Sequence, residues 1–467
     1  MAHGWSRRKV LTGAGIGGAA ALLAACGATP TQAPAVVLQP TGAATQEPVS
    51  SEATSAVAPG EKAKLLYWSY LTYTEDSEAP ILKAFDEAKS DIDLSWEYVP
   101  WEQYWQKLGT TLAAGNPPDV WNTAPNLYFE YILRRQLTDI TERVKADYNF
   151  DNWHPAALSG LDLQGRYYGV PRNMDLLACY FNKTLFDQAG VEPPPLDGNW
   201  TWDDYLEKAA AIVKFHNKGD RTLTWGGQSI QSWINLLIEM ESNGGQWWKG
   251  EFRRDLVGME FNITDPPCCE TLKFDSDLIN THKVAPPAGE FTGQADPFLT
   301  GQLAITQSYS WSVGAYQEVP FEWNLTQVPK GKVKQTAFGG CDGLVMSQAC
   351  EAKEGAWSLM RWLIDPETGA GFLIGEGVMP ARRDKVVMDP YLAKYPDKNV
   401  QALADAADKA GNPFALGSGE WGQALSDEFD KVYLGNTPAE EGCASATRSG
   451  NAALDRIRKE FQEAIGG

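Results

Sequence analysis

The sequence predicts an α/β fold in which helices cover a parallel sheet. Two kinds of pattern support this class: short apolar or alternating runs, which are typical of strands, and amphipathic stretches with helical spacing. The third observation is their order, because strands and helices alternate along the chain as they do in α/β proteins. The predicted strands are 63–68, 92–98 and a run from 119, and the helices between them are 77–89 and 101–114.

Each of these elements has a local reason. Residues 63–68 are an apolar run, whereas apolar and polar side chains alternate in residues 92–98. The helix at 77–89 gathers its apolar residues on one face. The next helix ends at Gly115, a residue type that commonly terminates helices.

The alternation continues in the second part of the chain. Residues 176–181 predict a strand, and the short helix after it ends at Gly190. Thr201 and Asp204 have the spacing of a capping box, with Thr at the N-cap, and predict a helix to about His216. The remaining predicted helices are 229–242, 265–282, 351–364, 366–373, 421–433 and 439–465.

The composition is that of a globular protein and argues against several classes of partner. The chain has 467 residues, which is enough for two or more lobes with substantial cores. Its formal net charge of −20 argues against nucleic acid or an anionic membrane surface as the main partner, because both need basic patches. The chain has 18 tryptophans, an excess that suits a surface where flat rings meet a ligand.

The N-terminus predicts export and a lipid anchor. Residues 1–25 have the form of an export signal, and the basic stretch at 6–11 resembles a twin-arginine signal. The apolar run at 10–25 has about 16 residues and is short for a membrane span, which needs roughly 20. It ends in Leu-Ala-Ala-Cys, which resembles a bacterial lipobox and predicts lipidation of Cys26; the alternative is an ordinary signal with a chance cysteine.

Residues 26–62 predict a flexible tether between the lipid and the folded part. They are rich in Ala, Thr, Pro, Gln and Ser, and such a composition buries little apolar surface. We therefore expect a protein that its lipid holds at the extracytoplasmic face of the cell membrane, on the cell surface or in the periplasm.

Six cysteines remain after Cys26, and they allow 15 pairings. Cys341 and Cys350 are close enough in sequence to form a disulfide, and the alternative is two buried thiols. For the neighbouring Cys268 and Cys269, two separate thiols are favoured over a strained bond between them.

Several kinds of catalytic and cofactor motif are absent from the sequence. The four histidines form no metal-binding pair, and neither a GxSxG elbow nor a GxxxxGK phosphate loop occurs. A GxGxxG match at 13–18 lies inside the export signal, with no strand before it, and predicts no nucleotide site. These absences argue against a zinc hydrolase, a serine hydrolase or an ATPase, and no cofactor is predicted. The 60 acidic residues leave a glycosidase carboxylate pair open.

A series of short motifs then runs through the chain in a fixed order. The motifs are 114–120 (AGNPPDV), 168–171 (YGVP), 179–190 (CYFNKTLFDQAG), 193–205 with its TWDD, 298–305 (FLTGQLAI) and 338–340 (FGG). In order and spacing they resemble the family 1 extracellular solute-binding proteins, the maltose-binding-protein-like group. The resemblance covers nearly the whole chain from residue 63.

The resemblance implies a two-lobed periplasmic-binding-protein type II fold with a hinge and a ligand cleft between the lobes. The chain is then expected to cross between lobes near Arg172, near Gly340 and within 380–389. Lobe one would comprise 63–172 and 341–385, and lobe two 173–340 and 386–467.

The resemblance also implies which side chains line the cleft, on loops that follow strands. The expected ligand contacts are Trp68, Tyr70, Thr123, Asn126, Arg172, Asp175, Trp233, Tyr309, Trp311 and Trp421. Carboxylates and amides suit sugar hydroxyls, and flat aromatic rings suit the C–H faces of a sugar. Three alternatives stay open: Trp68 could end a core strand, Asp175 could pair with Arg172 across the hinge, and Asp342 is a further candidate for a polar contact.

The function that the resemblance implies is capture of a sugar or oligosaccharide for an ABC importer, without catalysis. A neutral sugar is favoured over glycerol phosphate or another polar solute, because few basic residues are expected near the cleft. The expected partners are the sugar, the permease subunits and the membrane that holds the lipid, and the protein is expected to be a monomer. The alternatives are an exported carbohydrate-active enzyme, which needs two facing carboxylates, and a chemosensory binding protein without its own importer.

Overall fold

The structure is a computed structural model of the chain, and it describes residues 62–70, 75–219, 224–252, 254, 256–291 and 296–465. The predicted export signal, the lipidation of Cys26 and nearly all of the predicted tether lie outside these residues. No helix of the described residues combines the length and the apolar character that a membrane crossing requires.

The first strands form a parallel arrangement, as the sequence predicts. β1 (Ala63–Ser69) pairs in parallel with both β2 (Ile92–Tyr98) and β3 (Val120–Thr123). The helices between them are α1 (Glu75–Ala88) and α2 (Trp101–Ala113). All five elements therefore form within a few residues of their predicted bounds.

The rest of the sheet is antiparallel, so the prediction of a parallel sheet holds only for β1 to β3. β6 (Gly169–Asn182) pairs antiparallel with β11 (Gly339–Met346), β9 (Ile305–Tyr309) and β10 (Trp323–Thr326), and β11 pairs antiparallel with β3. The strand order is β10-β6-β11-β3-β1-β2, with β9 also on β6. The direction changes because β6 and β11 traverse the sheet in opposite senses and carry the chain between its two parts.

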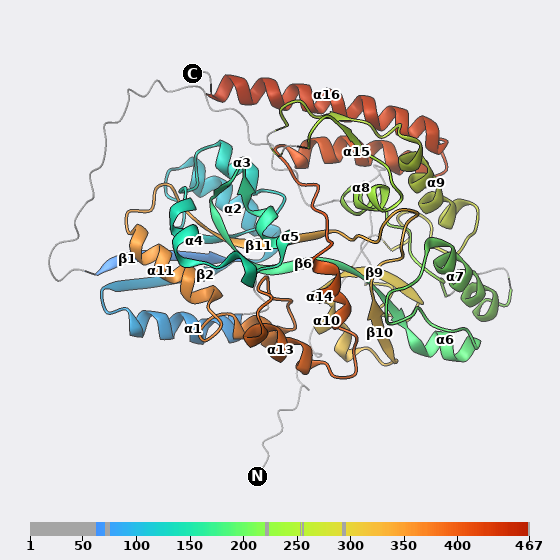
Figure 1. Cartoon of the computed structure of the whole chain (residues 1–467), viewed down its shortest axis with the longest axis horizontal. Coiled ribbons are helices and arrows are strands. Elements are labelled where there is room, and N and C mark those ends of the chain that lie inside the picture. Colours follow the sequence, from blue (N-terminus) through green and yellow to red (C-terminus); the bar gives the residue numbers. More distant parts are fainter. Residues whose placement is uncertain are drawn as a thin grey trace, which may run out of the picture. The chain divides into compact units, whose positions relative to one another are not determined.

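β6 is the strand that joins these parts. Its first half, to Leu176, pairs with β11, and its second half, from Leu177, pairs with β9 and β10. Figure 1 shows β6 running from the side of β1, β2 and β11 to the side of β9 and β10. Every residue of β6 is buried except Asp175, which is half-buried. A single acidic side chain therefore reaches a partly open space in the middle of an otherwise enclosed strand.

Most helices of the second part match their predictions. α6 (Lys183–Ala189) ends at Gly190, which is in the left-handed region. α7 (Trp202–His216) begins at the predicted capping box: Thr201 Oγ1 accepts a hydrogen bond from the Asp204 amide at 3.2 Å, and Asp204 Oδ2 accepts one from the Thr201 amide at 2.8 Å. α16 (Ala439–Ile465) has the predicted bounds and lies alongside α15 (Ser418–Tyr433) (Figure 1).

Two helices begin later than predicted. α8 (Trp233–Ser242) starts four residues after 229, because residues 227–232 have no regular structure. α12 (Gly371–Glu376) starts after a run of turns at 366–370. α9 (Pro266–Asn280) and α11 (Lys353–Ile364) agree with the predictions. The further helices, which were not predicted, are α3 (Tyr128–Leu133), α4 (Thr141–Asp147), α5 (Pro155–Gly160), α10 (Ser312–Ala315), α13 (Lys385–Lys394) and α14 (Gln401–Ala407).

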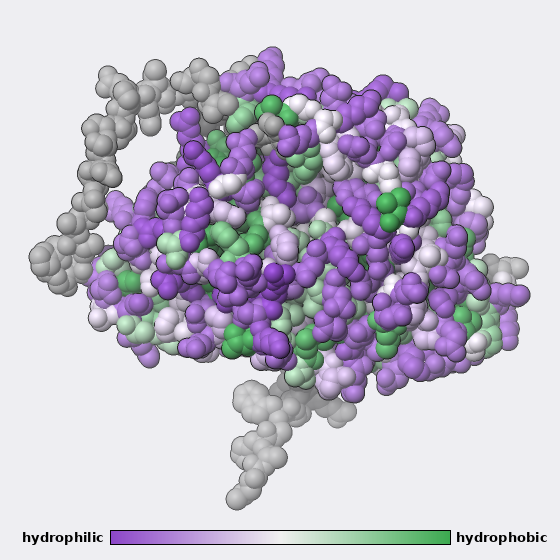
Figure 2. All heavy atoms as spheres, viewed as in Figure 1, coloured by the Kyte–Doolittle hydropathy of each residue, from purple (hydrophilic) through white to green (hydrophobic). Residues whose placement is uncertain are grey.

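Six cysteines lie in the described residues, and all are free thiols. Cys341 is buried, and its Sγ lies 3.1 Å from the carbonyl oxygen of Ala157; Cys350 is buried as well. The structure thus has the two buried thiols rather than a bond between them. On the face shown in Figure 2, polar side chains dominate and apolar ones form small scattered patches.

Candidate ligand site

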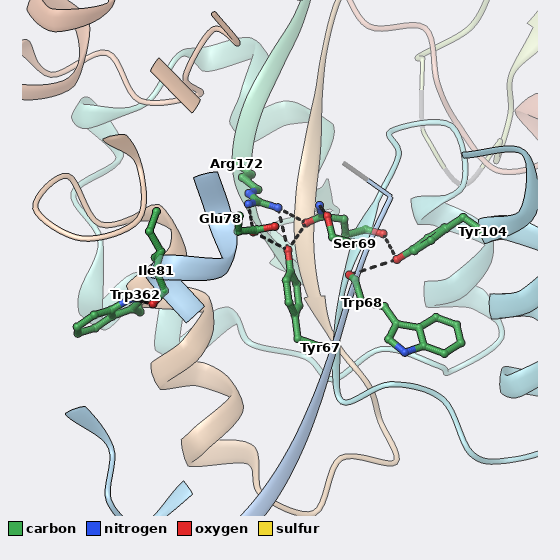
Figure 3. Close-up of polar contacts among 9 residues, drawn as sticks. Tyr67, Trp68, Ser69, Glu78, Ile81, Tyr104, Arg172 and Trp362 are labelled. Carbon is green, nitrogen blue, oxygen red and sulfur yellow. Dashed lines mark hydrogen bonds and ion pairs between the residues drawn. The ribbon is translucent and has the colours of Figure 1, made fainter. Parts of the chain in front are cut away.

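Arg172 is held in a buried polar cluster at the start of β6 (Figure 3). Its guanidinium pairs with Glu78 of α1, and both side chains are fully buried. Its Nη1 also donates to the Tyr67 hydroxyl and to Asn122 Oδ1, each at 2.9 Å. Burial is the largest single effect and would lower the pKa of Arg172, but the charge and hydrogen bond of Glu78 together with Tyr67 and Tyr98 outweigh it and raise the pKa. Arg172 thus stays charged and ties β6 to α1, β1 and β3.

Three of the predicted contacts are engaged inside the protein. Besides Arg172, Thr123 is fully buried, and its hydroxyl lies 3.4 Å from the carbonyl oxygen of Ala124. Trp421 is also fully buried, and its indole Nε1 donates to the carbonyl oxygen of Leu416 at 3.0 Å. Because these groups have no exposed surface here, we do not include them in the candidate site.

Two aspartates meet on the strands that connect the two parts of the sheet. Asp342 of β11 stands opposite Asn173 of β6, and Asp175 lies two residues further along the same strand. Asn173 Nδ2 donates to Asp342 Oδ2 at 3.1 Å and lies 3.4 Å from Asp175 Oδ1. Burial raises the pKa of both carboxyl groups, and for Asp175 the neighbouring Asp342 raises it further. We call Asp175 and Asp342, which share Asn173 Nδ2 as a donor, the acid pair.

Aromatic rings border the acid pair from the side of β1. Tyr70, directly after β1, is buried, and its hydroxyl has no hydrogen bond of good geometry to any described residue. Burial and then the charges of Asp342 and Asp175 raise its pKa, so the hydroxyl faces the acid pair. Trp101 and Trp105 of α2 pack against the Tyr70 ring with centroids 5.0 and 5.3 Å away, and Trp101 is 41% exposed.

Trp68 lies on the same side, and the sequence left open whether it contacts the ligand or ends a core strand. The structure gives it features of both. It is buried at the end of β1, with its indole directed away from the Arg172 cluster (Figure 3). Lys107 Nζ lies 4.5 Å from its ring. Its Nε1 is nevertheless buried without a hydrogen-bond partner in the described part of the chain.

A second aromatic pair borders the acid pair from the side of β9. Tyr309, the last residue of β9, stacks on Trp311 with centroids 4.5 Å apart, and Trp311 is 44% exposed. The Tyr309 hydroxyl lies 3.4 Å from Asn235 Oδ1, and burial together with the charge of Asp175 raises its pKa to about 12. The charge of Asp175 thus raises the pKa of two tyrosines, Tyr70 in one part of the sheet and Tyr309 in the other.

The remaining predicted contacts lie at the edge of this arrangement. Trp233, at the start of α8, is half-buried and packs edge-on against the buried Trp421 with centroids 4.7 Å apart. Asn126 is half-buried, and its carbonyl oxygen accepts a hydrogen bond from Ser418 at 3.3 Å. Within the described residues, no group of three or more His, Cys, Asp or Glu side chains is arranged to hold a metal ion.

The arrangement can now be compared with known proteins. Residues 81–422, nearly three quarters of the chain, match the family model of the bacterial extracellular solute-binding proteins. This chain belongs to that family. Its fold is the two-lobed periplasmic-binding-protein type II fold, as its structural neighbours show. An ABC substrate-binding protein of Listeria monocytogenes, solved with cycloalternan, superposes with a TM-score of 0.71 at 22% identity, over 87% of this chain and 100% of its own.

Curated relatives of this solute-binding protein bind different solutes. The lactose-binding protein of Rhizobium radiobacter is 24% identical over 301 residues, which cover 60% of this chain and 63% of the relative. The sn-glycerol-3-phosphate-binding periplasmic protein of Pectobacterium atrosepticum is 24% identical over 322 residues, which cover 63% and 68%. Identity at this level does not choose between the two solutes, and the choice depends on the chemistry of the site.

Sequence reasoning missed three residues of the site in this solute-binding protein. Trp101 and Trp105 follow β2 at the same edge of the sheet where Tyr70 follows β1, so the rule that placed Tyr70 could have found them. Asn173 bridges the acid pair through a contact across two strands that are more than 160 residues apart in the chain, and no local pattern marks it.

Proposed function

We propose that this solute-binding protein captures a sugar or oligosaccharide outside the cell and delivers it to the permease of an ABC importer. The observation that carries the proposal is the acid pair on the two connecting strands, with Tyr70 on one side and the stacked Tyr309 and Trp311 on the other. Carboxyl groups hydrogen-bond to sugar hydroxyls, and exposed rings cover the C–H faces of the sugar.

The proposed mechanism is closure of two lobes around the ligand. Lobe one comprises 63–172 and 341–385, lobe two comprises 173–340 and 386–467, and the connecting strands act as the hinge. The chain passes between the two parts of the sheet along β6 and β11, and an isolated bridge from Asn173 to Pro380 adds a third connection beside them. A ligand seated on the acid pair would touch both lobes and so favour the closed state.

The acid pair argues against the two main alternatives. A phosphorylated solute requires cationic or N–H donors, whereas Asp175 and Asp342 bring negative charge, and the guanidinium of Arg172 is paired with Glu78. A glycosidase requires its two carboxyl groups about 5–5.5 Å apart for retention or about 6.5–9.5 Å apart for inversion. Asp175 and Asp342 share Asn173 Nδ2 as a donor, at 3.4 and 3.1 Å, and lie side by side on neighbouring strands rather than on opposite sides of a substrate.

A thermal-shift screen of the purified protein against sugars, oligosaccharides, polyols and glycerol phosphates tests the proposal. A sugar present at about 100 times its dissociation constant is expected to stabilise the protein by roughly 2.7 kcal/mol. The shift should vanish in Asp175→Ala and Trp311→Ala. Phe215→Ala is the matched control, because Phe215 of α7 is 43% exposed, as Trp311 is 44% exposed, but lies outside the site.

Three results, from this screen and from two further assays, would contradict the proposal. Stabilisation by phosphorylated compounds alone would agree with the family but would show that the ligand is a phosphorylated solute and not the proposed sugar. Release of reducing sugar from an oligosaccharide would show that the protein is a carbohydrate-active enzyme instead. A bound sugar that leaves the scattering profile of the protein unchanged would argue against lobe closure, and so against the transport role.

We also propose that the protein is exported by a twin-arginine signal and anchored through a lipid on Cys26, as a monomer. Cys26→Ala is expected to abolish labelling by a radioactive fatty acid and to move the protein from the membrane fraction to the soluble fraction. Cys443→Ala, which changes a buried cysteine of α16, is the control and should leave labelling intact. Labelling of the Cys26→Ala protein would contradict the anchor.

A further inference from the structure

The acid pair carries more negative charge than its surroundings neutralise. Asp175 and Asp342 lie on the connecting strands, and Glu78 of α1 is close to them through Arg172. The Arg172 guanidinium is paired with Glu78, although its charge also lowers the pKa of Asp342. The titratable groups that face the pair are Tyr70 after β1, Tyr104 on α2, Tyr309 on β9 and Cys341 on β11. Burial raises the pKa of each of these four, so they are uncharged at neutral pH.

Polar atoms around the pair are also left without protein partners. Asn173 Oδ1 is buried and has no hydrogen-bond partner among the described residues, and the buried Tyr70 hydroxyl faces Asp342 without a hydrogen bond of good geometry. Asn173 is 2% exposed and its amide nitrogen already serves the acid pair, so its free oxygen is an acceptor. Two carboxyl groups and an amide oxygen together form a site rich in acceptors, which favours a ligand with several N–H or O–H donors.

Aromatic faces complete this environment. Trp101 and Trp311 are the exposed rings of the two aromatic groups, and Tyr70 and Tyr309 lie between them and the acid pair. Aromatic rings attract a cation through their negative faces, and the attraction grows as the cation is desolvated. Carboxylates and aromatic faces therefore favour the same type of ligand group.

We propose that the sugar captured by this protein carries a protonated amine, which binds at Asp175 and Asp342 between the two aromatic groups. The inference rests on the proposed function and names its substrate class, and it replaces the neutral sugar expected from the sequence. The ammonium group donates to both carboxylates, and the sugar ring lies against the exposed indoles.

Binding of an amino sugar and binding of a neutral sugar are expected to differ in the release of protons from the acid pair. In the free protein the acid pair shares a proton, because two carboxylates in contact repel one another. The single positive charge of an ammonium group offsets one carboxylate and lowers the pKa of the other carboxyl group, so part of the shared proton is released to solvent when the ligand binds. A neutral sugar brings no charge and leaves the proton in place.

Isothermal titration calorimetry of the purified protein tests this with three disaccharides on one frame: the β-1,4 dimer of glucosamine, its N-acetylated form and cellobiose. Glucosamine, N-acetylglucosamine and glucose are compared in the same way. At pH 6 the amines are protonated, and two buffers with different ionisation enthalpies report proton release. We expect an amine to bind at least tenfold more tightly than its neutral counterparts and to release protons to solvent, up to one for each amine bound.

Asp342→Asn is expected to reduce the preference for the amine to below threefold and to abolish proton release. Asp296→Asn is the matched control, because Asp296 accepts a hydrogen bond from Tyr316 at 2.7 Å outside the acid pair. The comparison of ligands on the unmodified protein stands even if a variant fails to fold.

Four outcomes would overturn the inference. A neutral sugar that binds as tightly as its amine, or an amine that binds without proton release, contradicts it. Binding of a neutral sugar in the thermal-shift screen with no binding of any amine overturns it while the proposed function stands. Absence of binding by every sugar overturns both.

Discussion

Replacing Arg172 with methionine is expected to destabilise the protein by about 3–5 kcal/mol, because the change leaves Glu78 as a buried charge without its partner. Both side chains of the pair are fully buried, and Arg172 also donates to Tyr67 and Asn122. The variant therefore loses an ion pair and two further hydrogen bonds while methionine fills most of the space. Urea unfolding followed by tryptophan fluorescence measures the loss as a lower midpoint.

Arg166→Met is the matched control for this change. Arg166 is 67% exposed and lies 3.7 Å from Asp139, and an exposed pair of this kind contributes roughly 0–1 kcal/mol. The double variant Glu78→Leu with Arg172→Met should recover part of the stability, since neither charge is then buried alone. If Arg172→Met unfolds at the unmodified midpoint but no longer binds ligand, Arg172 belongs to the ligand site as the sequence predicted.

The case of Arg172 shows where prediction from the sequence stops. Helix bounds followed from local patterns, and α16 and the capping box at Thr201 agree with the structure because propensity and capping act within a few residues. The partners of Arg172 are 50 to 105 residues away in the chain, on α1, β1 and β3. No local pattern distinguishes a guanidinium that meets a ligand from one that meets a buried glutamate.

The same distinction governs the aromatic residues. The sequence placed Trp311 and Trp421 alike at strand or helix ends, and the structure separates these two residues by burial. Trp311 is 44% exposed and stacks on Tyr309, whereas Trp421 is enclosed by Trp233 and Phe261. Asp175 was expected at the ligand because an acid amid apolar neighbours needs a reason. Its partner across the strands is Asp342, which the sequence offered as a further polar contact, and not Arg172.

Replacing Glu239 with glutamine is expected to make the protein less sensitive to alkaline pH. Glu239 of α8 is 2% exposed, and its Oε2 accepts a hydrogen bond from the Trp202 indole at 3.1 Å. Its Oε1 is buried with no partner among the described residues and lies in a cavity that Asp275 and Gln307 also line. Burial, and then the charge of Asp275, raises the pKa of Glu239 to about 8.

The sign of the effect follows from proton binding. An unfolded glutamate has a pKa near 4.3, so between about pH 4.5 and 8 the folded protein holds a proton that the unfolded chain has lost. The stability that this proton contributes is fully present below the unfolded pKa and falls as pH rises, by about 1.4 kcal/mol per unit, until Glu239 ionises. Between pH 6.5 and 8 the unmodified protein should thus lose about 2 kcal/mol that the glutamine variant retains.

Urea unfolding of both proteins at intervals from pH 6 to 9 measures this difference. The window lies above the pKa of Asp275, which burial raises to about 6, so the difference between the two proteins reports Glu239. Glu241→Gln is the matched control on the same helix. Glu241 accepts a hydrogen bond from Trp247 and pairs with Lys334 at the surface, so this variant tests whether loss of any glutamate from α8 changes the pH dependence of stability. Parallel pH profiles for Glu239→Gln and the unmodified protein would show that Glu239 is already ionised in the fold. In that case the folded protein would hold the Glu239 carboxylate in its charged form at neutral pH, and burial would not stabilise a proton on this residue.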